Sequence, residues 1–343
     1  MNYTDFRFRA EVDFLKLRIH LGAESTFPAL QRFARSLLGY TPHVQPIEAG
    51  PSGASRIFVL TFQSPQRWRE VDNVLRRLDE RFPFTRAATV DGVEIALDGY
   101  SEAHSADQLA ELAAHMYWGC QRPVSPNRRI YRDVAGMGQA VPTQGRLRRR
   151  LLDGWQIGIG NRGDGLYQHG YVKTTDKGRP LPIEQHCARF EVRVQGEALS
   201  VRDWSAWRAI NGRIVGVNGI SNSTSIPSEF IANSPENVAK LLSFRRLDEA
   251  KLAESLPFAQ VVMEAHSQIG ERKIRNRRGG GTRLHSRFTE ADAELNARAR
   301  EALRKLWARW GAEPRKSPSR TSRESARQGS ACGISGVPES VTA

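Results

Sequence analysis

Segments in which apolar and polar residues alternate recur along this chain, and amphipathic helical patterns separate them. Residues 12–21 (VDFLKLRIHL) alternate in this way, which is typical of a half-buried strand. Similar strand patterns occupy 41–47, 56–63 and 89–98, and helical patterns occupy 28–38, a segment that opens at Ser64 and Pro65, and a segment that Ser105 caps. The order strand-helix-strand-strand-helix-strand is the split βαβ arrangement of a ferredoxin-like half-domain.

A second strand-rich block follows, at 154–160, 166–175 and 187–195. We therefore expect an α+β fold with ferredoxin-like antiparallel sheets, in which the two blocks could be related half-domains. The last helical pattern starts at Thr289. The predicted organisation has four parts, which are an N-terminal half-domain (1–125), a second sheet block with the candidate active site (126–200), a helical C-terminal region (201–312) and a disordered tail (313–343).

The chain carries a strong positive charge, with 51 Lys and Arg against 37 Asp and Glu and a formal net charge of +14. Arginine strongly outnumbers lysine, and its planar guanidinium matches phosphate groups and guanine edges. A surplus of this kind makes polyanions the expected partners, nucleic acid first and an anionic membrane second. The alternative is that the arginine content reflects a GC-rich genome, in a structural or partner-binding protein.

No apolar run reaches the roughly 18 residues that a membrane-spanning helix needs, and the first residues are too charged for a secretory signal. The cysteines Cys120, Cys187 and Cys332 lie far apart, which favours neither a zinc site nor a disulfide framework. We therefore expect a cytoplasmic protein without a membrane partner.

Residues 158–163 (GIGNRG) match the spacing of a dinucleotide-binding loop. Such a loop needs a helix directly behind it, because the helix N-terminus binds the pyrophosphate. Here Asp164 and Gly165 lead into a tyrosine-rich strand pattern, so we interpret the glycines as a tight hairpin. The chain contains no P-loop sequence, which argues against an ATPase of that class.

Two acidic residues, Glu94 and Asp98, lie four residues apart on the strand pattern at 89–98, so both side chains leave the same face. Their backbones are about 13 Å apart, from ~3.3 Å per residue, which is too far for one metal ion to bind both directly. Either residue could instead join a carboxylate of a neighbouring strand, such as Glu191, in a site for Mg²⁺ or Mn²⁺. The alternative is that both are solvated charges on an open sheet face.

Four side chains, those of Tyr167, His169, Tyr171 and Lys173, share one face of the strand pattern at 166–175. A tyrosine phenol can attack phosphorus and form a covalent phosphotyrosine link. A metal ion or basic side chains must then offset the phosphate charge in the transition state. These residue types on adjacent strands indicate phosphodiester chemistry, and the alternative is an ordinary sheet surface.

Three segments in a fixed order carry a resemblance to a known family. They are Gly160-Asn161-Arg162, then 171–178 (YVKTTDKG), then 189–194 (RFEVRV). They resemble the core of rolling-circle replication initiators from small plasmids and filamentous phages. In the first block, 12–15 (VDFL) resembles the opening strand of that family, and 93–98 (VEIALD) resembles its strand of Ile-Asp-x-Ala-x-Asp type. The likeness covers residues 10–200.

The resemblance implies a replication initiation protein that binds origin DNA, single- or double-stranded, and nicks one strand with Mg²⁺ or Mn²⁺ as cofactor. A tyrosine would keep the 5′-phosphate covalently and release a 3′-hydroxyl that primes synthesis. It implies Tyr171 as the catalytic residue and, as metal ligands, Glu94, Asp98, Asp176 and Glu191. The implied DNA-binding residues are Arg162, Lys173, Lys177, Arg189 and Arg193.

One position departs from the family pattern. Thr175 stands directly before Asp176, Lys177 and Gly178, where the family usually has a tyrosine. Either Tyr171, roughly 13 Å earlier along the strand, is the nucleophile in a shifted register, or the protein binds DNA without nicking it. The chain is thus either a DNA-nicking endonuclease or a non-enzymatic DNA- or RNA-binding regulator, and either could act as a homodimer.

Overall fold

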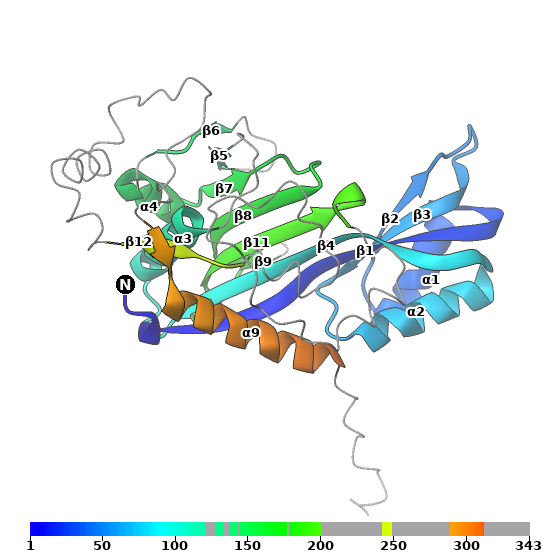
Figure 1. Cartoon of the computed structure of the whole chain (residues 1–343). Helices are drawn as coiled ribbons and strands as arrows, with labels where there is room; N and C mark the ends of the chain where they lie inside the picture. Colours follow the sequence, from blue (N-terminus) through cyan, green and yellow to red (C-terminus); the bar gives the residue numbers. More distant parts are fainter. Residues whose placement is uncertain are drawn as a thin grey trace, which may run out of the picture. The chain divides into compact units, whose positions relative to one another are not determined.

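The computed structural model describes residues 1–120, 128–132, 138–142, 144–176, 178–199, 242–248 and 289–311. Within them, nine strands form one antiparallel sheet in the order β2-β3-β1-β4-β11-β8-β7-β5-β6 (Figure 1). The strands are β1 (Phe6–Thr26), β2 (His43–Ile47), β3 (Ala54–Gln63), β4 (Phe84–Ser101), β5 (Arg128–Tyr131), β6 (Gln139–Ala140), β7 (Gln156–Ile159), β8 (Leu166–Lys173) and β11 (Cys187–Gln195). Together with the helices described next, this sheet confirms the predicted α+β fold.

The first block of the chain has the connections of a split βαβ unit. The helix α1 (Phe27–Leu38) joins β1 to β2, and α2 (Trp68–Arg81) joins β3 to β4. In the order β2-β3-β1-β4, each of these pairs is separated by one other strand, as that arrangement requires. Since β11 pairs with β4, both predicted blocks belong to one sheet. The ferredoxin-like assignment and the domain boundaries stay predictions.

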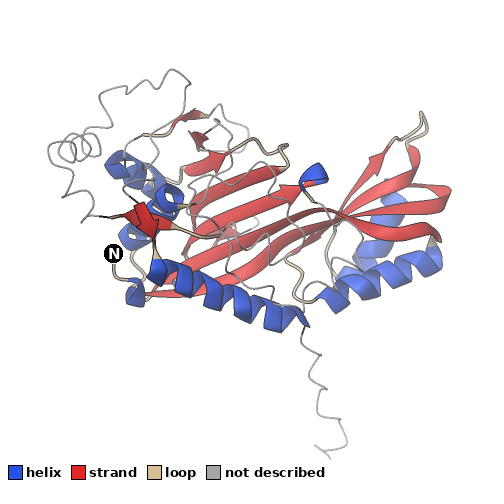
Figure 2. Cartoon of the chain, in the orientation of Figure 1, coloured by secondary structure: helices blue, strands red, loops and turns tan. Residues whose placement is uncertain are grey.

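The sheet has an apolar face and a polar face. On the apolar face, side chains such as Val12, Leu15, Ile95 and Phe190 form the hydrophobic core with the helices α1, α2, α3 (Ala106–Gly119) and α4 (Gln144–Leu152) (Figure 2). On the polar face, β4, β11 and β8 carry ionisable and aromatic side chains that include Glu94, Glu191 and Tyr171. The candidate functional side chains therefore lie on the face of the sheet opposite these helices.

A bulge in β1 decides which side chains reach the polar face. The pairing of β1 with β4 shifts register between Val12 and Phe14. Such a bulge adds one residue to a strand and re-aims its neighbours. As a result, Asp13 accepts a hydrogen bond from Arg189, and the Phe14 ring lies under the Arg193 guanidinium. Two successive residues of β1 thus face the same polar surface.

Several predicted boundaries are confirmed. α1 ends at Gly39, whose φ of 73° is the left-handed conformation that glycine tolerates. Ser105 caps α3 by accepting a hydrogen bond from the Gln108 backbone N–H at 3.3 Å. β7 and β8 pair as an antiparallel hairpin around the glycine-rich turn, which confirms the hairpin interpretation of 158–163.

Two predicted helix starts are wrong. α2 begins at Trp68 instead of Ser64, because Ser64 has a φ of 44° and its backbone N–H donates to the Asp13 carbonyl, which keeps it in a turn after β3. Thr289 lies in a short strand, β13 (Thr289–Ala291), paired with β12 (Arg245–Leu247). Asp292 caps the last helix, α9 (Ala293–Gly311), by accepting from the Leu295 N–H at 3.1 Å.

The helix α9 lies along the N-terminal half of β1 (Figure 1), which β3 does not reach because its pairing begins at Phe14. Arg309 donates to the Ala10 carbonyl at 2.8 Å, and the buried Trp310 donates its indole N–H to the Pro65 carbonyl. The helix thus covers a strand edge that would otherwise be open to pairing. Trp310 also belongs to the hydrophobic core.

Most of the predicted helical C-terminal region, at 201–241 and 249–288, lies outside the described residues, and so does the predicted tail. Among the helices that are described, none is both long enough and apolar enough to cross a lipid bilayer.

Candidate active site

Three carboxylates from three adjacent strands meet on the polar face. They belong to Asp13 of β1, Glu94 of β4 and Glu191 of β11, and one oxygen of each lies within 4.8 Å of the others. Neighbouring strands lie only ~4.8 Å apart, so the bulge at Asp13 is what brings the third side chain to the other two. We call these three residues the carboxylate cluster. Glu94 and Glu191 are buried, with 2% and 5% exposure.

Tyr171 and His169 of β8 both donate hydrogen bonds to Glu191. The Tyr171 hydroxyl lies 2.8 Å from Oε1, and His169 Nδ1 lies 3.1 Å from Oε2. A carboxylate only accepts, so Nδ1 of the imidazole carries a proton. His169 Nε2 lies 3.0 Å from the Gln156 side chain, which fixes the other edge of the ring. The arrangement holds a phenol directly against a cluster carboxylate.

Crowding of buried negative charge shifts the pKa values of the cluster. Burial and the Glu191 charge raise the pKa of Glu94 to about 8 and raise that of Asp13. Burial acts on Glu191 in the same direction, but hydrogen bonds from His169 and Tyr171 and the Arg189 charge outweigh it and lower its pKa to about 2. Burial and Glu191 also raise the pKa of Tyr171. Glu191 is therefore the ionised member, beside a protonated phenol.

Arg189 connects the carboxylate cluster to a second acidic group. Its Nε donates to Asp98 at 2.6 Å and its Nη1 to Asp13 at 2.9 Å, while Nη2 donates to Asp98 at 2.7 Å and also to Glu11. All three nitrogens are therefore engaged by carboxylates, and Asp98 is fully buried. Buried charges persist when they are paired in this way.

Arg193 provides a second positive charge at the cluster. Its Nε donates to Glu94 Oε2 at 2.7 Å. The guanidinium lies 4.7 Å from the Phe14 ring centroid and 5.7 Å from that of Tyr167, distances suited to cation–π attraction. The aromatic rings hold this arginine beside Glu94.

A tyrosine pair, Tyr131 of β5 and Tyr167 of β8, borders the site. The hydroxyls of Tyr131 and Tyr167 are hydrogen-bonded to one another. Arg162, in the turn between β7 and β8, has its guanidinium 5.7 Å from the Tyr131 centroid. The Tyr131 ring in turn stacks on His169, with centroids 5.8 Å apart and planes 14° apart. Aromatic and basic groups therefore continue from the carboxylate cluster toward this end of the sheet.

The structure brings some of the predicted site residues together and separates others. Tyr171, Glu94 and Glu191 meet, while Asp98 pairs with Arg189 instead of facing the cluster. Asp176 lies in a small separate ribbon of β9 (Thr175–Asp176) and β10 (Arg179–Pro180), where it pairs with Lys173 at 3.0 Å. Lys177 lies outside the described residues. The role of each as ligand or DNA contact stays a prediction.

The carboxylate cluster has the donor set that a hard divalent cation requires. Mg²⁺ and Mn²⁺ prefer carboxylate oxygens, and three such side chains converge within 4.8 Å. Burial, and after it the Glu191 charge, raise the pKa of Glu94, and a bound cation would offset both. Arg193 and Arg189 supply part of the counter-charge from the sides. The residues present therefore fit a divalent cation.

The sequence assigned no role to Asp13 or Gln156, and it placed His169 on the strand face of Tyr171 without a partner of its own. A signal for Asp13 exists in the alternation of β1. Its buried residues alternate at Ala10 and Val12, and then two successive residues, Phe14 and Leu15, are buried before the alternation resumes. Such a slip in a period-2 pattern indicates a bulge.

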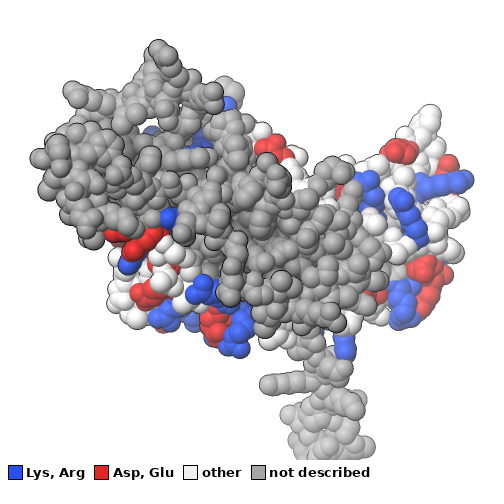
Figure 3. Space-filling view, in the orientation of Figure 1, with Lys and Arg blue, Asp and Glu red and all other residues white. Residues whose placement is uncertain are grey.

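Much of the positive charge lies away from the cluster and is balanced locally. Figure 3 shows Lys and Arg beside Asp and Glu on the described surface of α2 and α9. Examples are Arg76 with Glu80 on α2 and Arg304 with Glu301 on α9. Exposed pairs of this kind contribute little stability. The total charge alone therefore does not locate a nucleic-acid surface.

No family model and no curated protein matches this chain. Among solved structures, a rolling circle replication initiator protein from Geobacillus stearothermophilus is 11% identical, with a TM-score of 0.28 over 55% of this chain and 75% of that one. An aspartate kinase from Synechocystis is 9% identical, with a TM-score of 0.18 over 91% of this chain and 57% of that one. The first is an initiator of the type that the sequence resembles.

Proposed function

We propose that this protein is a replication initiation enzyme that binds DNA and nicks one strand, with Tyr171 as the nucleophile. The observation that carries the proposal is the 2.8 Å hydrogen bond from the Tyr171 hydroxyl to Glu191, a member of the carboxylate cluster. A nucleophile, an ionised carboxylate that can accept its proton and a candidate cation site thus lie together. These groups together suit the transfer of a phosphodiester to a tyrosine.

In the proposed reaction, the Tyr171 oxygen forms a bond to the scissile phosphorus while the bond from phosphorus to the 3′-oxygen of the preceding nucleotide breaks. The phenol proton passes to Glu191, and the departing 3′-oxygen takes a proton from water. The products are a 5′-phosphotyrosine link and a free 3′-hydroxyl. Because burial and Glu191 raise the pKa of Tyr171, the phenol must lose its proton as the bond to phosphorus forms.

Asp13, Glu94 and Glu191 would hold the divalent cation, Mg²⁺ or Mn²⁺, which when bound supplies positive charge next to the phosphate oxygens. His169 holds Glu191 in place through Nδ1, and Gln156 holds His169. Arg193, beside Glu94, is placed to meet the phosphate, whereas the nitrogens of Arg189 are directed to carboxylates. Arg189 thus acts as a positioning residue in this proposal, and Arg193 as a phosphate contact.

A second candidate function is DNA or RNA binding without cleavage. The ion pairs of Arg193 with Glu94 and of Arg189 with Asp13 favour it, because arginines that neutralise the carboxylates reduce the need for a cation. In that case the polar face is a stabilised charge network that contacts nucleic acid. Thr175, where the initiator family usually has a tyrosine, also agrees with it.

Covalent capture separates the two candidates. The full chain is incubated with single-stranded DNA carrying the sequence of its own replicon and with Mn²⁺, denatured, and examined for a protein–DNA adduct whose attachment residue is mapped by mass spectrometry. We expect wild type to form an adduct at Tyr171 and Tyr171→Phe to form none. Tyr167→Phe, on the same strand and face, is the matched control and should keep most of the adduct.

Equal adduct in wild type and Tyr171→Phe would exclude Tyr171 as the nucleophile. An adduct that disappears only in Tyr167→Phe would identify Tyr167 as the nucleophile instead of Tyr171. DNA binding without any adduct, with or without Mn²⁺, would favour the binding protein.

A further inference from the structure

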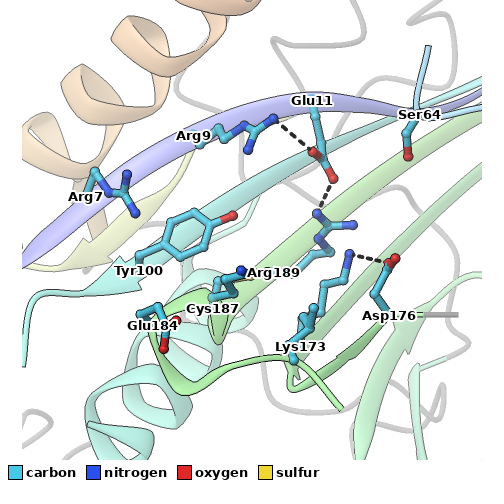
Figure 4. Close-up of a pocket in the computed structure, with 12 residues that line it drawn as sticks. Arg7, Arg9, Glu11, Ser64, Tyr100, Lys173, Asp176, Glu184, Cys187 and Arg189 are labelled. Atoms are coloured by element: carbon cyan, nitrogen blue, oxygen red, sulfur yellow. Dashed lines mark hydrogen bonds and ion pairs between the residues drawn. The ribbon is translucent and has the colours of Figure 1, made fainter. Parts of the chain in front are cut away.

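A pocket of about 490 Å³ lies next to the carboxylate cluster on the polar face (Figure 4). Its wall includes Arg7 and Arg9 of β1, Tyr100 of β4 and Lys173 of β8. This volume falls within the ~300–1,000 Å³ typical of small-molecule sites. The proposed chemistry at Tyr171 uses neither Arg7, Arg9 nor Tyr100.

Two of the charged pairs in the pocket are internally satisfied. Glu11 accepts from Arg189, and Lys173 pairs with Asp176 at 3.0 Å. Figure 4 shows Glu11 between Arg9 and Arg189, with a dashed line to each, and Lys173 joined to Asp176 farther along the wall. These pairs hold the wall in place and leave little net charge of their own.

Arg7 and Arg9 are the cations best placed to meet an anion. Among the described residues, no carboxylate lies within ion-pair distance of Arg7, whose guanidinium lies 5.0 Å from the Tyr100 ring centroid. Arg9 reaches Glu11 only at 3.8 Å, and its side chain is 48% exposed. Being two residues apart on one strand, both leave the same face, with backbones ~6.6 Å apart. Two guanidinium forks at this spacing suit a phosphate group.

Tyr100 gives the pocket an aromatic surface. Its hydroxyl lies 3.5 Å from Asp98, which the buried Arg189 also binds. The ring is therefore anchored at its polar end to the same network that holds the cluster. Tyrosine rings bind unpaired bases by stacking, with little dependence on sequence. Glu184, also in the wall, is an acceptor suited to the amino group of a base such as cytosine.

Arg189 joins this pocket to the carboxylate cluster. The same guanidinium donates to Glu11 in the pocket wall and, at 2.9 Å, to Asp13 in the cluster. A group bound in the pocket and a phosphate at Tyr171 would therefore lie on either side of one buried side chain. Such a separation suits consecutive nucleotides of one strand.

We propose that this pocket binds one nucleotide of the cleaved DNA strand next to the scissile phosphate, with its phosphate on Arg7 and Arg9 and its base against Tyr100. The assignment rests on the proposed nicking function. A free mononucleotide offers the same phosphate and base, so the test must distinguish a free mononucleotide from a nucleotide within a DNA strand.

The test measures non-covalent binding of the full chain to fluorescent single-stranded oligo(dC) in EDTA, over a series of salt concentrations. The Arg7→Ala/Arg9→Ala variant should bind at least about tenfold more weakly, and its salt slope should fall by roughly 0.7 for each phosphate that is no longer neutralised. Tyr100→Leu should weaken binding with the slope unchanged, since stacking releases no counterions. Arg76→Ala/Arg77→Ala removes the same charge from the exposed face of α2 and should leave affinity and slope near the wild-type values.

Equal losses in the Arg7/Arg9 and Arg76/Arg77 variants would overturn the proposal, since charge alone would then explain them. Arginine-dependent binding of dCMP, with oligo(dC) affinity unaffected by the same variant, would also overturn it in favour of a free nucleotide. The adduct assay keeps this result separate from the proposed function. If wild type forms the adduct but the Arg7→Ala/Arg9→Ala variant keeps the wild-type salt slope, only the pocket assignment is rejected. If that variant has a reduced salt slope but wild type forms no adduct, only the nicking function is rejected.

Discussion

At the scale of the residue, the polar face is organised by side chains that compensate one another's charge. Arg189 is the clearest case, because its side chain is 3% exposed and it binds Asp98, Asp13 and Glu11. A buried charge is stable only while its partners remain. The position of Asp13 in the carboxylate cluster therefore depends on an arginine whose hydrogen bonds go to carboxylates on two neighbouring strands.

We predict that Arg189→Met destabilises the fold strongly, because it leaves Asp98 buried without its partner. Breaking a buried ion pair by removing one side chain costs about 3–5 kcal/mol, which urea denaturation would measure. Arg18→Met is the matched control, since Arg18 and Asp91 form a partly exposed pair with side-chain exposures of 31% and 18%. That change should cost under about 1 kcal/mol. Similar losses in both variants would contradict the assigned role of Arg189.

At the scale of the element, the sequence predicted strands more reliably than side-chain placement. Alternation located β1, β4 and β11 because each has one face in the core. It could not show that Asp13 joins Glu94 and Glu191, because a bulge changes which residues face the same way and its position depends on the partner strand. The family resemblance likewise implied Asp98 as a ligand, but the sequence does not reveal that Arg189 pairs directly opposite it.

The two predictions of helix starts were wrong for a related reason. The Ser64-Pro65 pair is a good capping sequence, yet the turn that follows β3 requires Ser64 in a left-handed conformation. At the other end of the chain, Thr289 pairs with a strand more than forty positions earlier in sequence, at Leu247. Tertiary contacts therefore determine where α2 and α9 begin, and a local sequence pattern contains no information about such contacts.

Three elements meet at Asp292, the residue that caps α9. Its buried carboxylate accepts hydrogen bonds from Tyr3 near the N-terminus at 2.5 Å, from His115 of α3 at 2.9 Å and from the Leu295 N–H. Burial acts to raise the pKa of Asp292, but these hydrogen bonds outweigh it and hold the pKa below its ordinary value of 3.8. One carboxylate thus ties the first residues, α3 and α9 together.

We predict that Asp292→Asn lowers stability at neutral pH but removes part of the acid sensitivity of the fold. A carboxyl whose folded-state pKa is lowered stabilises the protein fully above its unfolded pKa, and this contribution is lost as pH falls through the folded value. The difference in urea midpoint between wild type and variant should therefore be largest at neutral pH and shrink below pH 3.8. A difference that stayed constant down to acid pH would show that ionisation of Asp292 does not contribute.

At the scale of the whole molecule, one sheet joins segments that are far apart in sequence. The strand β4 pairs with β1 on one side and with β11 on the other, and each of the three strands provides one member of the carboxylate cluster. A cation bound there would connect the N-terminal block to the second block. Since the cluster forms only in the folded sheet, binding of the cation should be coupled to folding.

We predict that Mn²⁺ raises the thermal unfolding midpoint of the full chain and that EDTA reverses the rise. A ligand that binds only the folded state stabilises it by about 2.7 kcal/mol at a concentration 100 times its dissociation constant. Glu191→Gln should lose most of the shift, each protein being compared with itself in EDTA so that any change in baseline stability cancels. Asp176→Asn removes a carboxylate predicted as a ligand from the sequence but paired with Lys173 outside the cluster, and it should keep the full shift. The same response to Mn²⁺ in all three proteins would place the ion elsewhere, and loss of the shift in Asp176→Asn alone would restore the ligand set inferred from the sequence.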